Sequence, residues 1–221
     1  MYPSILKNSG LFDELPSRDF MQLCSCVKRR TEDFEKKQVL VYQGDSVSEI
    51  GILTKGSLVG EKYHMDGRVQ IIRIFSPYSV VNLDAASSSA KTCPISITAT
   101  DSGRIIWIPF DEMFKGDDLS ADVRKTLFDN IMSILADDNI RMMHKSDILA
   151  VRTLRERIMA YFSIVSEKRG DMTVRLSMNQ EELARYLCVD RSSLSSELNK
   201  MRKEGVLDFS KKTYTLMFNE N

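Results

Sequence analysis

Residues 177–207 constrain the fold of this chain more than any other stretch, because their pattern predicts two short helices joined by a tight turn. Asn179 is placed to cap the first helix, and Glu182, three residues later, completes the pattern of a capping box. A narrow apolar stripe follows on the same helix, formed by Leu183, Ala184 and Leu187. After a turn at Cys188 and Val189, Asp190 is placed to cap the second helix. The stretch therefore predicts a helix-turn-helix.

The second predicted helix has one apolar and one polar face. Its inward residues repeat at i, i+4 and i+7, and they are Leu194, Leu198 and Met201. A rotation of about 100° per residue places Ser192, Ser196, Asn199 and Lys203 outward, with Arg191 projecting from the first turn. This outward face has hydroxyls, an amide and cations but no carboxylate. Such a face suits hydrogen bonding to base edges and phosphates in the DNA major groove.

An ordinary helical hairpin with a solvated serine-rich face would share this pattern, but the flanking residues favour DNA binding. Gly205 ends the second helix, and residues 206–210 and 213–217 alternate like a β-hairpin around Lys211 and Lys212. Together with a strand-like segment at 173–176, they predict a winged helix-turn-helix. Its dibasic wing tip is suited to contact phosphate.

The charge distribution agrees with this prediction. The 221 residues are 43% hydrophobic and 28% charged, with a formal net charge of zero. From Val151 onward, however, 13 Lys and Arg face 10 Asp and Glu, whereas 18 face 21 before it. The positive C-terminal part points to a nucleic-acid module. Because no apolar run has membrane-spanning length and Met1-Tyr2-Pro3 leads into a polar segment, we expect a cytoplasmic protein without membrane partners.

Cysteine and histidine usage argues against a metal centre. Cys24, Cys26, Cys93 and Cys188 are scattered, and no Cys-x-x-Cys spacing suggests zinc or an iron-sulfur cluster. The two histidines are too few for a metal-dependent barrel enzyme. We therefore predict no metal and identify no cofactor. Idle thiols and a redox-sensing pair at Cys24 and Cys26 both remain open.

Residues 31–110 are β-rich. The predicted strands are residues 39–42, 50–53, 58–64, 69–75, 95–100 and 103–108. Asp66-Gly67, between the third and fourth of these, is a strong hairpin signal. Many short strands with glycine turns indicate a barrel or jelly roll. The spacing of apolar residues in front, at 5–28, is helical.

Beyond Pro109 the apolar period becomes helical, and a long helix is predicted from Leu119 to about His144. Its apolar residues are Val123, Leu127, Ile131, Ile134 and Leu135. Part of this helix must pack on its own barrel, yet its length also suits a parallel dimer seam, and we predict a homodimer through these five residues. Two helix-turn-helix motifs related by a two-fold axis would match two DNA half-sites ~34 Å apart. A break near 145–147 is predicted before another amphipathic helix at 151–167.

The predicted fold class is α+β in three parts. Residues 1–118 form a sensor domain, a double-stranded β-helix or jelly roll with N-terminal helices. Residues 119–146 form the long dimerisation helix. Residues 147–221 form the winged helix-turn-helix domain.

This order of elements resembles the Crp-Fnr superfamily of bacterial transcription regulators over nearly the whole chain. The residues that carry the resemblance are Tyr-Gln-Gly-Asp at 42–45, Leu-Thr-Lys-Gly-Ser-Leu at 53–58, Leu-Arg-Glu-Arg-Ile at 154–158 and Asp-Arg-Ser-Ser-Leu-Ser-Ser-Glu-Leu at 190–198. The resemblance implies a homodimer that binds double-stranded DNA, responds to a signal sensed in the roll, and has RNA polymerase as a further partner.

The DNA-binding residues predicted from the helix pattern and this resemblance are Gln180, Arg191, Ser192, Ser193, Ser196, Asn199, Lys200, Lys211 and Lys212. Arg191 is the preferred guanine reader, because an arginine fork matches guanine O6 and N7. Gln180 is assigned to phosphate. Ser192 and Ser196 stand where family members commonly have Glu and Arg, so the operator is expected to differ from the best-known sites.

The roll departs from the cyclic-nucleotide-binding members of the family, which use a Gly-Glu-Leu carboxylate for the ribose and an Arg-Ser/Thr pair for the cyclic phosphate. Here Asp84 falls one position late, and Cys93-Pro94-Ile95-Ser96 stands where the arginine is expected. Without that cation the phosphate would lose its main electrostatic partner, so we expect an effector other than cyclic AMP. The predicted effector contacts are Asn82, Asp84, Ser87, Ser88 and Lys91; an ordinary exposed loop is the alternative.

Two other classes of function are alternatives to a regulator. A metabolite-binding signalling module whose C-terminal hairpin binds protein would share much of this pattern, but would show no preference for duplex DNA. An enzyme is disfavoured, because the sequence shows no nucleophile-base pair, phosphate-binding loop or set of metal ligands.

Overall fold

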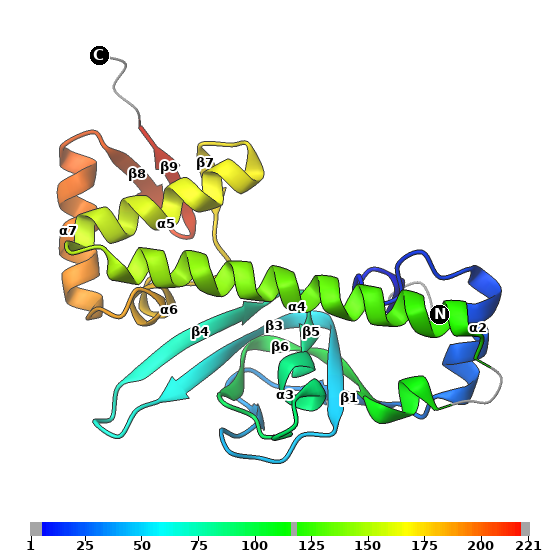
Figure 1. The fold of residues 1–221 in the computed structure, drawn as a ribbon. Helices are drawn as coiled ribbons and strands as arrows, with labels where there is room; N and C mark the ends of the chain where they lie inside the picture. Colours follow the sequence, from blue (N-terminus) through cyan, green and yellow to red (C-terminus); the bar gives the residue numbers. More distant parts are fainter. Residues whose placement is uncertain (1–5, 116–118, 218–221) are drawn as a thin grey trace. The chain divides into compact units, whose positions relative to one another are not determined.

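The computed structural model describes residues 6–115 and 119–217, and the chain divides into two compact units, Met1–Asp138 and Asn139–Asn221 (Figure 1). The long helix α4 (Ala121–Ala150) begins in the first unit and ends in the second. The predicted domain limits at residues 1, 118 and 221 lie outside the described residues. Across the described part of the chain, no helix combines the length and apolar character needed to cross a membrane.

The first unit is an antiparallel β-roll preceded by helix. Its elements are α2 (Ser17–Cys26), β1 (Arg30–Phe34), β2 (Val39–Val41), β3 (Glu49–Tyr63), β4 (Val69–Phe75), β5 (Val80–Val81), α3 (Leu83–Ser87), β6 (Ser96–Pro109), the 3₁₀ helix η1 (Asp111–Phe114) and the first part of α4. The sheet order is β1-β6-β3-β4, with β2 also paired to β6 and β5 to β3. The predicted roll is confirmed, and the Asp66-Gly67 hairpin joins β3 to β4 as expected.

The two longest strands were each predicted as two shorter ones. β3 and β6 pair along most of their length, with register shifts on either side of Lys55. Gly56 has φ +90°, and a Cβ on Gly103 would lie 2.0 Å from the Lys55 carbonyl oxygen. A bulge at these glycines bends both strands without ending them, which explains why the glycine signals looked like turns in the sequence.

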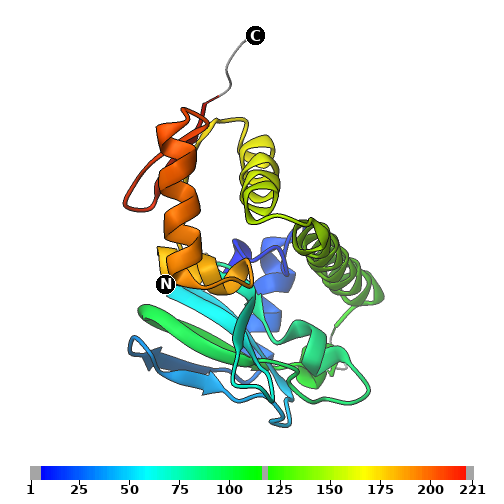
Figure 2. The ribbon, with the colours of Figure 1, turned by 90° about the vertical axis from the view of Figure 1, so that its left-hand side faces the viewer.

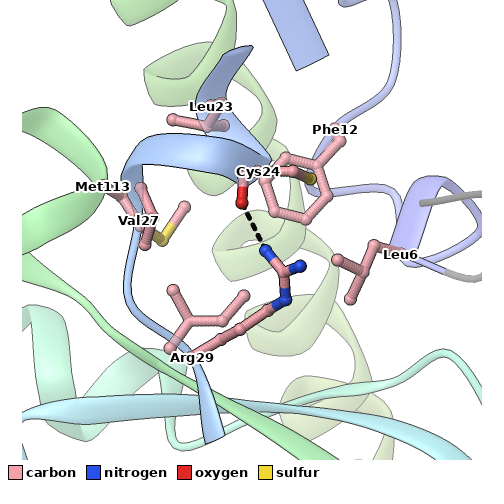
Figure 3. A pocket seen from close by; sticks show the side chains of 8 residues that line it. Leu6, Phe12, Leu23, Cys24, Val27, Arg29 and Met113 are labelled. Atoms are coloured by element: carbon pink, nitrogen blue, oxygen red, sulfur yellow. Dashed lines mark hydrogen bonds between the residues drawn. The ribbon is translucent and has the colours of Figure 1, made fainter. Parts of the chain in front are cut away.

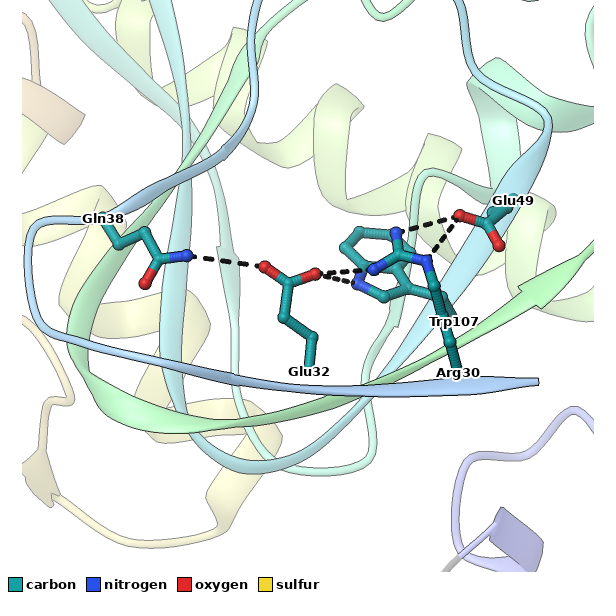
Figure 4. A network of polar contacts seen from close by, with 5 residues as sticks. All are labelled: Arg30, Glu32, Gln38, Glu49 and Trp107. Carbon is teal, nitrogen blue, oxygen red and sulfur yellow. Dashed lines mark hydrogen bonds and ion pairs between the residues drawn. The ribbon is translucent and has the colours of Figure 1, made fainter.

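A polar network joins three strands on the outside of the roll (Figure 4). Glu32 Oε2 accepts hydrogen bonds from Trp107 Nε1 at 2.7 Å and from Arg30 Nη1 at 2.8 Å. Arg30 Nη2 also donates to Glu49 Oε2 at 2.9 Å, and Gln38 Nε2 donates to the other oxygen of Glu32 at 3.4 Å. The network fixes β1 against β3 and β6, and because its ion pairs are partly exposed it adds only modestly to stability.

The core of the first unit draws on the N-terminal helical segment, the roll and α4. Its largest cluster includes Leu11, Phe12, Phe20, Ile50, Ile52, Ile106, Val123, Leu127 and Ile131. Each such side chain contributes about 1.5–3 kcal/mol when fully buried. The first part of α4 is thus an integral part of this unit.

α4 continues to Ala150, so the predicted break at 145–147 is wrong. The Lys-Ser-Asp sequence there contains no proline or glycine and does not end a helix. Lys145 and Ile148 are buried, so this part of α4 still packs one face against the protein. The three polar residues of this segment suggest a linker in the sequence, although they are helical.

The second unit holds the rest of the chain, and α5 (Leu154–Arg169) is its first complete helix. Thr153 caps α5 through a capping box with Glu156: Glu156 N donates to Thr153 Oγ1 at 3.2 Å, and Thr153 N donates to Glu156 Oε2 at 3.0 Å. These hydrogen bonds hold the pKa of the Glu156 carboxyl below its usual value. The helix predicted to begin at Val151 therefore begins three residues later, after this box.

The remaining elements form the predicted winged helix-turn-helix. They are β7 (Thr173–Arg175), α6 (Gln180–Tyr186), α7 (Arg191–Lys203), β8 (Leu207–Ser210) and β9 (Thr213–Leu216). The strands pair antiparallel in the order β7-β9-β8, and Figure 2 shows α7 in orange crossing the shorter α6. Tyr214 of β9 packs on Phe162 of α5, with ring centroids 4.7 Å apart. The wing therefore shares one core with the helix behind it.

A buried cation is part of this core. Lys145 is only 3% exposed, and its ammonium lies 4.0 Å from the centroid of the Tyr186 ring. Burial lowers the pKa of Lys145 to about 8, although the nearby Cys188 acts in the opposite direction. The aromatic face offsets part of the cost of removing the charge from water.

Candidate DNA-binding surface and effector segment

The helix-turn-helix has the local geometry that its sequence predicts. Asn179 and Glu182 form the expected capping box, with Glu182 N donating to Asn179 Oδ1 at 2.9 Å and Asn179 N donating to Glu182 Oε2 at 2.7 Å. The predicted inward residues are all buried: Leu183, Ala184, Leu187, Leu194, Leu198 and Met201. Cys188 takes φ +57° in the turn, a conformation that usually favours glycine. Asp190 occupies the N-cap position of α7 but its side chain makes no capping hydrogen bond.

The predicted base-reading face of α7 is exposed. Its exposed residues include Arg191, Ser192, Ser193, Ser196, Asn199 and Lys200. Asn199 Nδ2 donates to the Ser195 carbonyl at 2.9 Å, and its amide oxygen accepts no hydrogen bond within the described residues. Gln180, predicted to contact phosphate, is half-buried at the start of α6 beside the Tyr214 hydroxyl. Burial raises the pKa of Tyr214, and the Gln180 side chain opposes that shift.

Two arginines of α5 contact the helix-turn-helix, and the sequence predicts a role for neither. Arg155 Nε lies 2.7 Å from Glu197 Oε1, and its Nη1 lies 2.6 Å from Glu204 Oε2. Arg157 Nη1 donates to the Leu187 carbonyl at 2.9 Å and so satisfies the end of α6. The pKa of Arg155 is raised mainly by its hydrogen bonds to Glu204 and Glu197, and that of Glu204 is lowered. These ion pairs give both Glu197 of α7 and Glu204, the residue that follows the helix, a cationic partner within the unit.

The wing places Lys211 and Lys212 in the turn between β8 and β9, where both are exposed. Lys211 has φ +54°, as tight hairpin turns require, and Lys212 Nζ donates to the Ser177 carbonyl. β8 is held to α7 by Arg202, whose guanidinium stacks 3.7 Å from the Phe209 ring centroid. Arg202 and Lys212 thus make contacts inside the unit, whereas Lys211 makes no hydrogen bond or ion pair among the described residues. Both turn lysines are exposed and extend the basic surface beyond α7.

The predicted effector segment, residues 82–91, uses most of its polar groups locally. Ser87 Oγ donates to the Leu83 carbonyl at 2.6 Å, and Ser88 Oγ donates to the Ala85 carbonyl and accepts from Lys91 N. Lys91 Nζ is paired with Asp111 at 2.8 Å. Asn82 is buried in the left-handed conformation, φ +63°, at the start of α3. The five predicted residues share one short segment, and their main contacts stabilise it.

An arginine from strand β4 forms an ion pair with this segment. Arg73 Nη1 of β4 lies 3.3 Å from Asp84 Oδ2 and 3.4 Å from Asp138 Oδ2 of α4. No role is predicted for Arg73 from the sequence, because the contact between β4 and α3 joins residues that are distant in the chain. Two carboxylates already surround this guanidinium. Cys93, at the position expected for the phosphate-binding arginine, is buried, and burial raises the pKa of its thiol.

Comparison with known proteins gives these features a family context. The cyclic nucleotide-binding domain family matches residues 31–115, and the Crp-like helix-turn-helix domain family matches residues 156–217. The anaerobic regulatory protein of Haemophilus influenzae is 25% identical over 207 residues, which cover 91% of this chain and 78% of that protein. The chain belongs to the Crp-Fnr superfamily of transcription regulators.

Solved structures share the fold of this chain. The c-di-GMP-responsive global regulator CLP of Xanthomonas campestris aligns with a TM-score of 0.73 at 18% identity, covering 92% of this chain and all of that one. FixK2 of Bradyrhizobium japonicum aligns with a TM-score of 0.68 at 16% identity, covering 86% and 93%. Crp-Fnr regulators bind DNA through their helix-turn-helix and act as dimers, and the family consists of transcription regulators. This Crp-Fnr protein is a DNA-binding transcription regulator whose effector is unidentified.

The structure rules out three of the five residues predicted for the Crp-Fnr dimer seam. Val123, Leu127 and Ile131 are buried in the core of their own protomer, and Ile134 and Leu135 pack partly against it. Periodicity identifies an apolar face, but it does not tell whether the core of the same protomer or a second chain covers that face. A second apolar stripe on α4 remains exposed: Phe128, Met132, Met142 and Met143, with Ile140 beside it.

The structure also bears on Cys24 and Cys26. Cys24 borders a small apolar cavity of about 20 Å³ lined by Leu6, Phe12, Leu23, Val27, Arg29, Ile108 and Met113, and Arg29 donates to its carbonyl oxygen (Figure 3). Burial raises the pKa of the Cys24 thiol, although Arg29 opposes the shift, so the reactive thiolate is disfavoured. Positions two apart on helix α2 point in different directions, which also disfavours a Cys24–Cys26 disulfide.

Proposed function

We propose that this regulator reads its operator through the exposed face of α7 and grips the flanking phosphates with the wing. The observation that carries this proposal is that Arg191, at the start of α7, is exposed and makes no hydrogen bond or ion pair within the described residues. The proposed contacts are base edges for Arg191, Ser192, Ser196 and Asn199, and phosphates for Gln180, Ser193, Lys200, Lys211 and Lys212. An unpaired guanidinium beside a positive helix end suits guanine O6 and N7.

We infer that the dimer forms through the exposed stripe of α4. The spacing alternates between four and three residues, the pattern of coiled-coil core positions, in the exposed Phe128, Met132, Asn139 and Met142 together with the half-buried Leu135. Asn139 falls at one of these positions, and a single polar residue there favours two chains in fixed register. Phe128 is 57% exposed in the protomer, so a partner helix would remove much apolar surface from water.

Exchange of Phe128 for glutamate tests this seam. The Phe128→Glu protein is expected to sediment as a monomer, because a carboxylate on each chain cannot be buried in the seam. Met65→Glu is the matched control, since Met65 is fully exposed at the β3–β4 turn and belongs to no proposed interface. A dimer of unchanged stability in Phe128→Glu would contradict the assignment.

The effector and polymerase contacts are also proposals. We place the effector against Asn82, Asp84, Ser87, Ser88 and Lys91, because Arg73 links this segment to α4 through Asp84 and Asp138. A ligand that competes for Asp84 would release Arg73 and change its hold on α4. RNA polymerase is the protein partner expected of a transcription regulator, and the cytoplasm is the compartment in which both would meet DNA.

Selection from a random duplex library with the purified protein tests the central proposal. The expected result is a two-fold-symmetric site with half-sites ~34 Å apart. Affinity for that site should fall steeply with salt, because neutralised phosphates release counterions. Recovery of no preferred sequence, or binding insensitive to salt, would reject the proposed surface and favour a protein-docking module.

A further inference from the structure

The N-cap of α7 carries a carboxylate at the edge of an otherwise basic surface. Four carboxylates lie between residues 190 and 208, all within the described part of the chain. Glu197 and Glu204 are paired with Arg155, and Asp208 lies 3.3 Å from Arg202. Asp190 is exposed, makes no capping hydrogen bond, and has no ion pair among the described residues. Of these four carboxylates, Asp190 is the one without a partner among the described residues.

The helix dipole stabilises this carboxylate in the free protein, but in a complex with DNA the phosphates would repel it unless it meets a hydrogen-bond donor. The residue precedes Arg191, at the end of α7 proposed to enter the groove, where phosphates lie on both sides. Like charges about 4 Å apart repel by ~1 kcal/mol in water and by more where water is excluded. An aspartate used only as a cap would be expected to bond a backbone N–H at the helix start, and this one does not.

The major groove offers a carboxylate two exocyclic donors, and only one of them suits it well. An ionised carboxylate accepts hydrogen bonds and donates none. Cytosine presents the N4 amino group, whereas adenine sets an N7 acceptor beside its N6 amino group. Guanine O6 and N7 and thymine O4 are acceptors and would repel the charge. The chemistry therefore selects cytosine.

We propose that Asp190 is a specificity-determining residue that accepts a hydrogen bond from cytosine N4 next to the guanine read by Arg191. This inference rests on the proposed docking of α7 in the major groove. Adjacent Asp190 and Arg191 would read two neighbouring base pairs from the first turn of the helix. The preference for cytosine at one position of each half-site is expected to be about 5- to 150-fold.

Asp190→Asn separates base reading from helix capping. Asparagine caps helices as well as aspartate does, so the fold and α7 are retained. It pairs with adenine N6 and N7 instead of cytosine. The variant should therefore select adenine where the unmodified protein selects cytosine, and should bind an operator with that single replacement more tightly than the original. Asp190→Ala should lose the preference at that position alone.

Library selection is carried out in parallel on the unmodified protein, Asp190→Asn, Asp190→Ala and Lys200→Ala. Lys200→Ala is the control for a phosphate contact and should weaken all sites equally. Selected sequences that are identical for the unmodified protein and Asp190→Asn would overturn the inference and leave Asp190 a solvated helix-end charge. Failure of the unmodified protein to select any sequence would instead overturn the proposed function on which the inference rests.

Discussion

Two serine-rich segments of this chain look alike in sequence and differ in the structure. Residues 87–91 read Ser-Ser-Ser-Ala-Lys, and residues 191–196 read Arg-Ser-Ser-Leu-Ser-Ser. In the first, Ser87 and Ser88 bond to backbone carbonyls and Lys91 pairs with Asp111. In the second, Arg191 and the outward serines are exposed on a helix whose acidic residue, Glu197, is paired with Arg155. Composition marks both as polar; only the partners of each side chain distinguish a self-satisfied segment from a surface left free for a ligand.

Apolar residues on α4 show the same contrast between side chains that are packed in the protomer and side chains that are exposed. This contrast gives the largest predicted change in the free energy of unfolding. Leu127 is fully buried, whereas its neighbour Phe128 is exposed. Leu127→Ala should lower the free energy of unfolding of the first unit by about 2–5 kcal/mol, because it leaves a cavity. Phe128→Ala should change it by less than about 0.5 kcal/mol once dimer dissociation is accounted for.

Urea unfolding followed by the fluorescence of Trp107, the single tryptophan, measures both variants over a dilution series. Equal losses for the two variants would show that the faces of α4 are misassigned.

For the free polar surface, Arg191→Ala should cost about 1–3 kcal/mol of operator binding and relax the preference at one base pair, because the guanine fork is lost. Fluorescence anisotropy with the selected operator and its single-base variants measures this loss. Arg68→Ala is the charge-matched control: Arg68 lies on the β3–β4 turn, paired with Asp66, and its removal should leave operator affinity unchanged. A uniform loss at every base with Arg191→Ala would make this residue a phosphate contact.

Lys145, in the second unit, is a buried cation and so contrasts with the exposed Arg191. Its folded pKa of about 8 lies below the ordinary value of 10.5, so between these values the unfolded chain binds more protons. Stability should therefore rise with pH, by about 2 kcal/mol between about pH 7.5 and 9.5. Lys145→Met should remove this rise.

Urea unfolding of both proteins, followed by circular dichroism at each pH, checks the difference between them. Parallel pH profiles would show that the buried ammonium is not the cause.

The smallest effect is expected in the effector segment, whose ion pairs are partly solvated. Arg73→Gln leaves Asp84 and Asp138 without their shared cation and should destabilise the first unit by about 1 kcal/mol. Hydrogen exchange should increase at α3 and in the middle of α4. Arg68→Gln, which removes an exposed pair, should leave exchange there unaltered. No change with Arg73→Gln would remove the proposed link between the segment and α4.

Local patterns were sufficient for much of the fold. The capping box of Asn179 and Glu182, the i, i+4 and i+7 repeat of Leu194, Leu198 and Met201, and the Asp66-Gly67 turn depend on neighbours within a few residues. The order of these elements then predicted a Crp-Fnr regulator. Local signals failed at Gly56 and Gly103, where a bulge resembled a turn, and at 145–147, where polar residues continued a helix.

The sequence alone thus determined the element order, the polar face of α7 and the family, because short-range periodicity and capping are written in consecutive residues. Tertiary structure alone decided which face of α4 is already buried, that Arg73 reaches Asp84 and Asp138, and that Arg155 pairs with Glu197 and Glu204. Each of these depends on contacts between residues distant in the chain. Such a contact forms only when the fold brings two surfaces together, and periodicity carries no record of the partner.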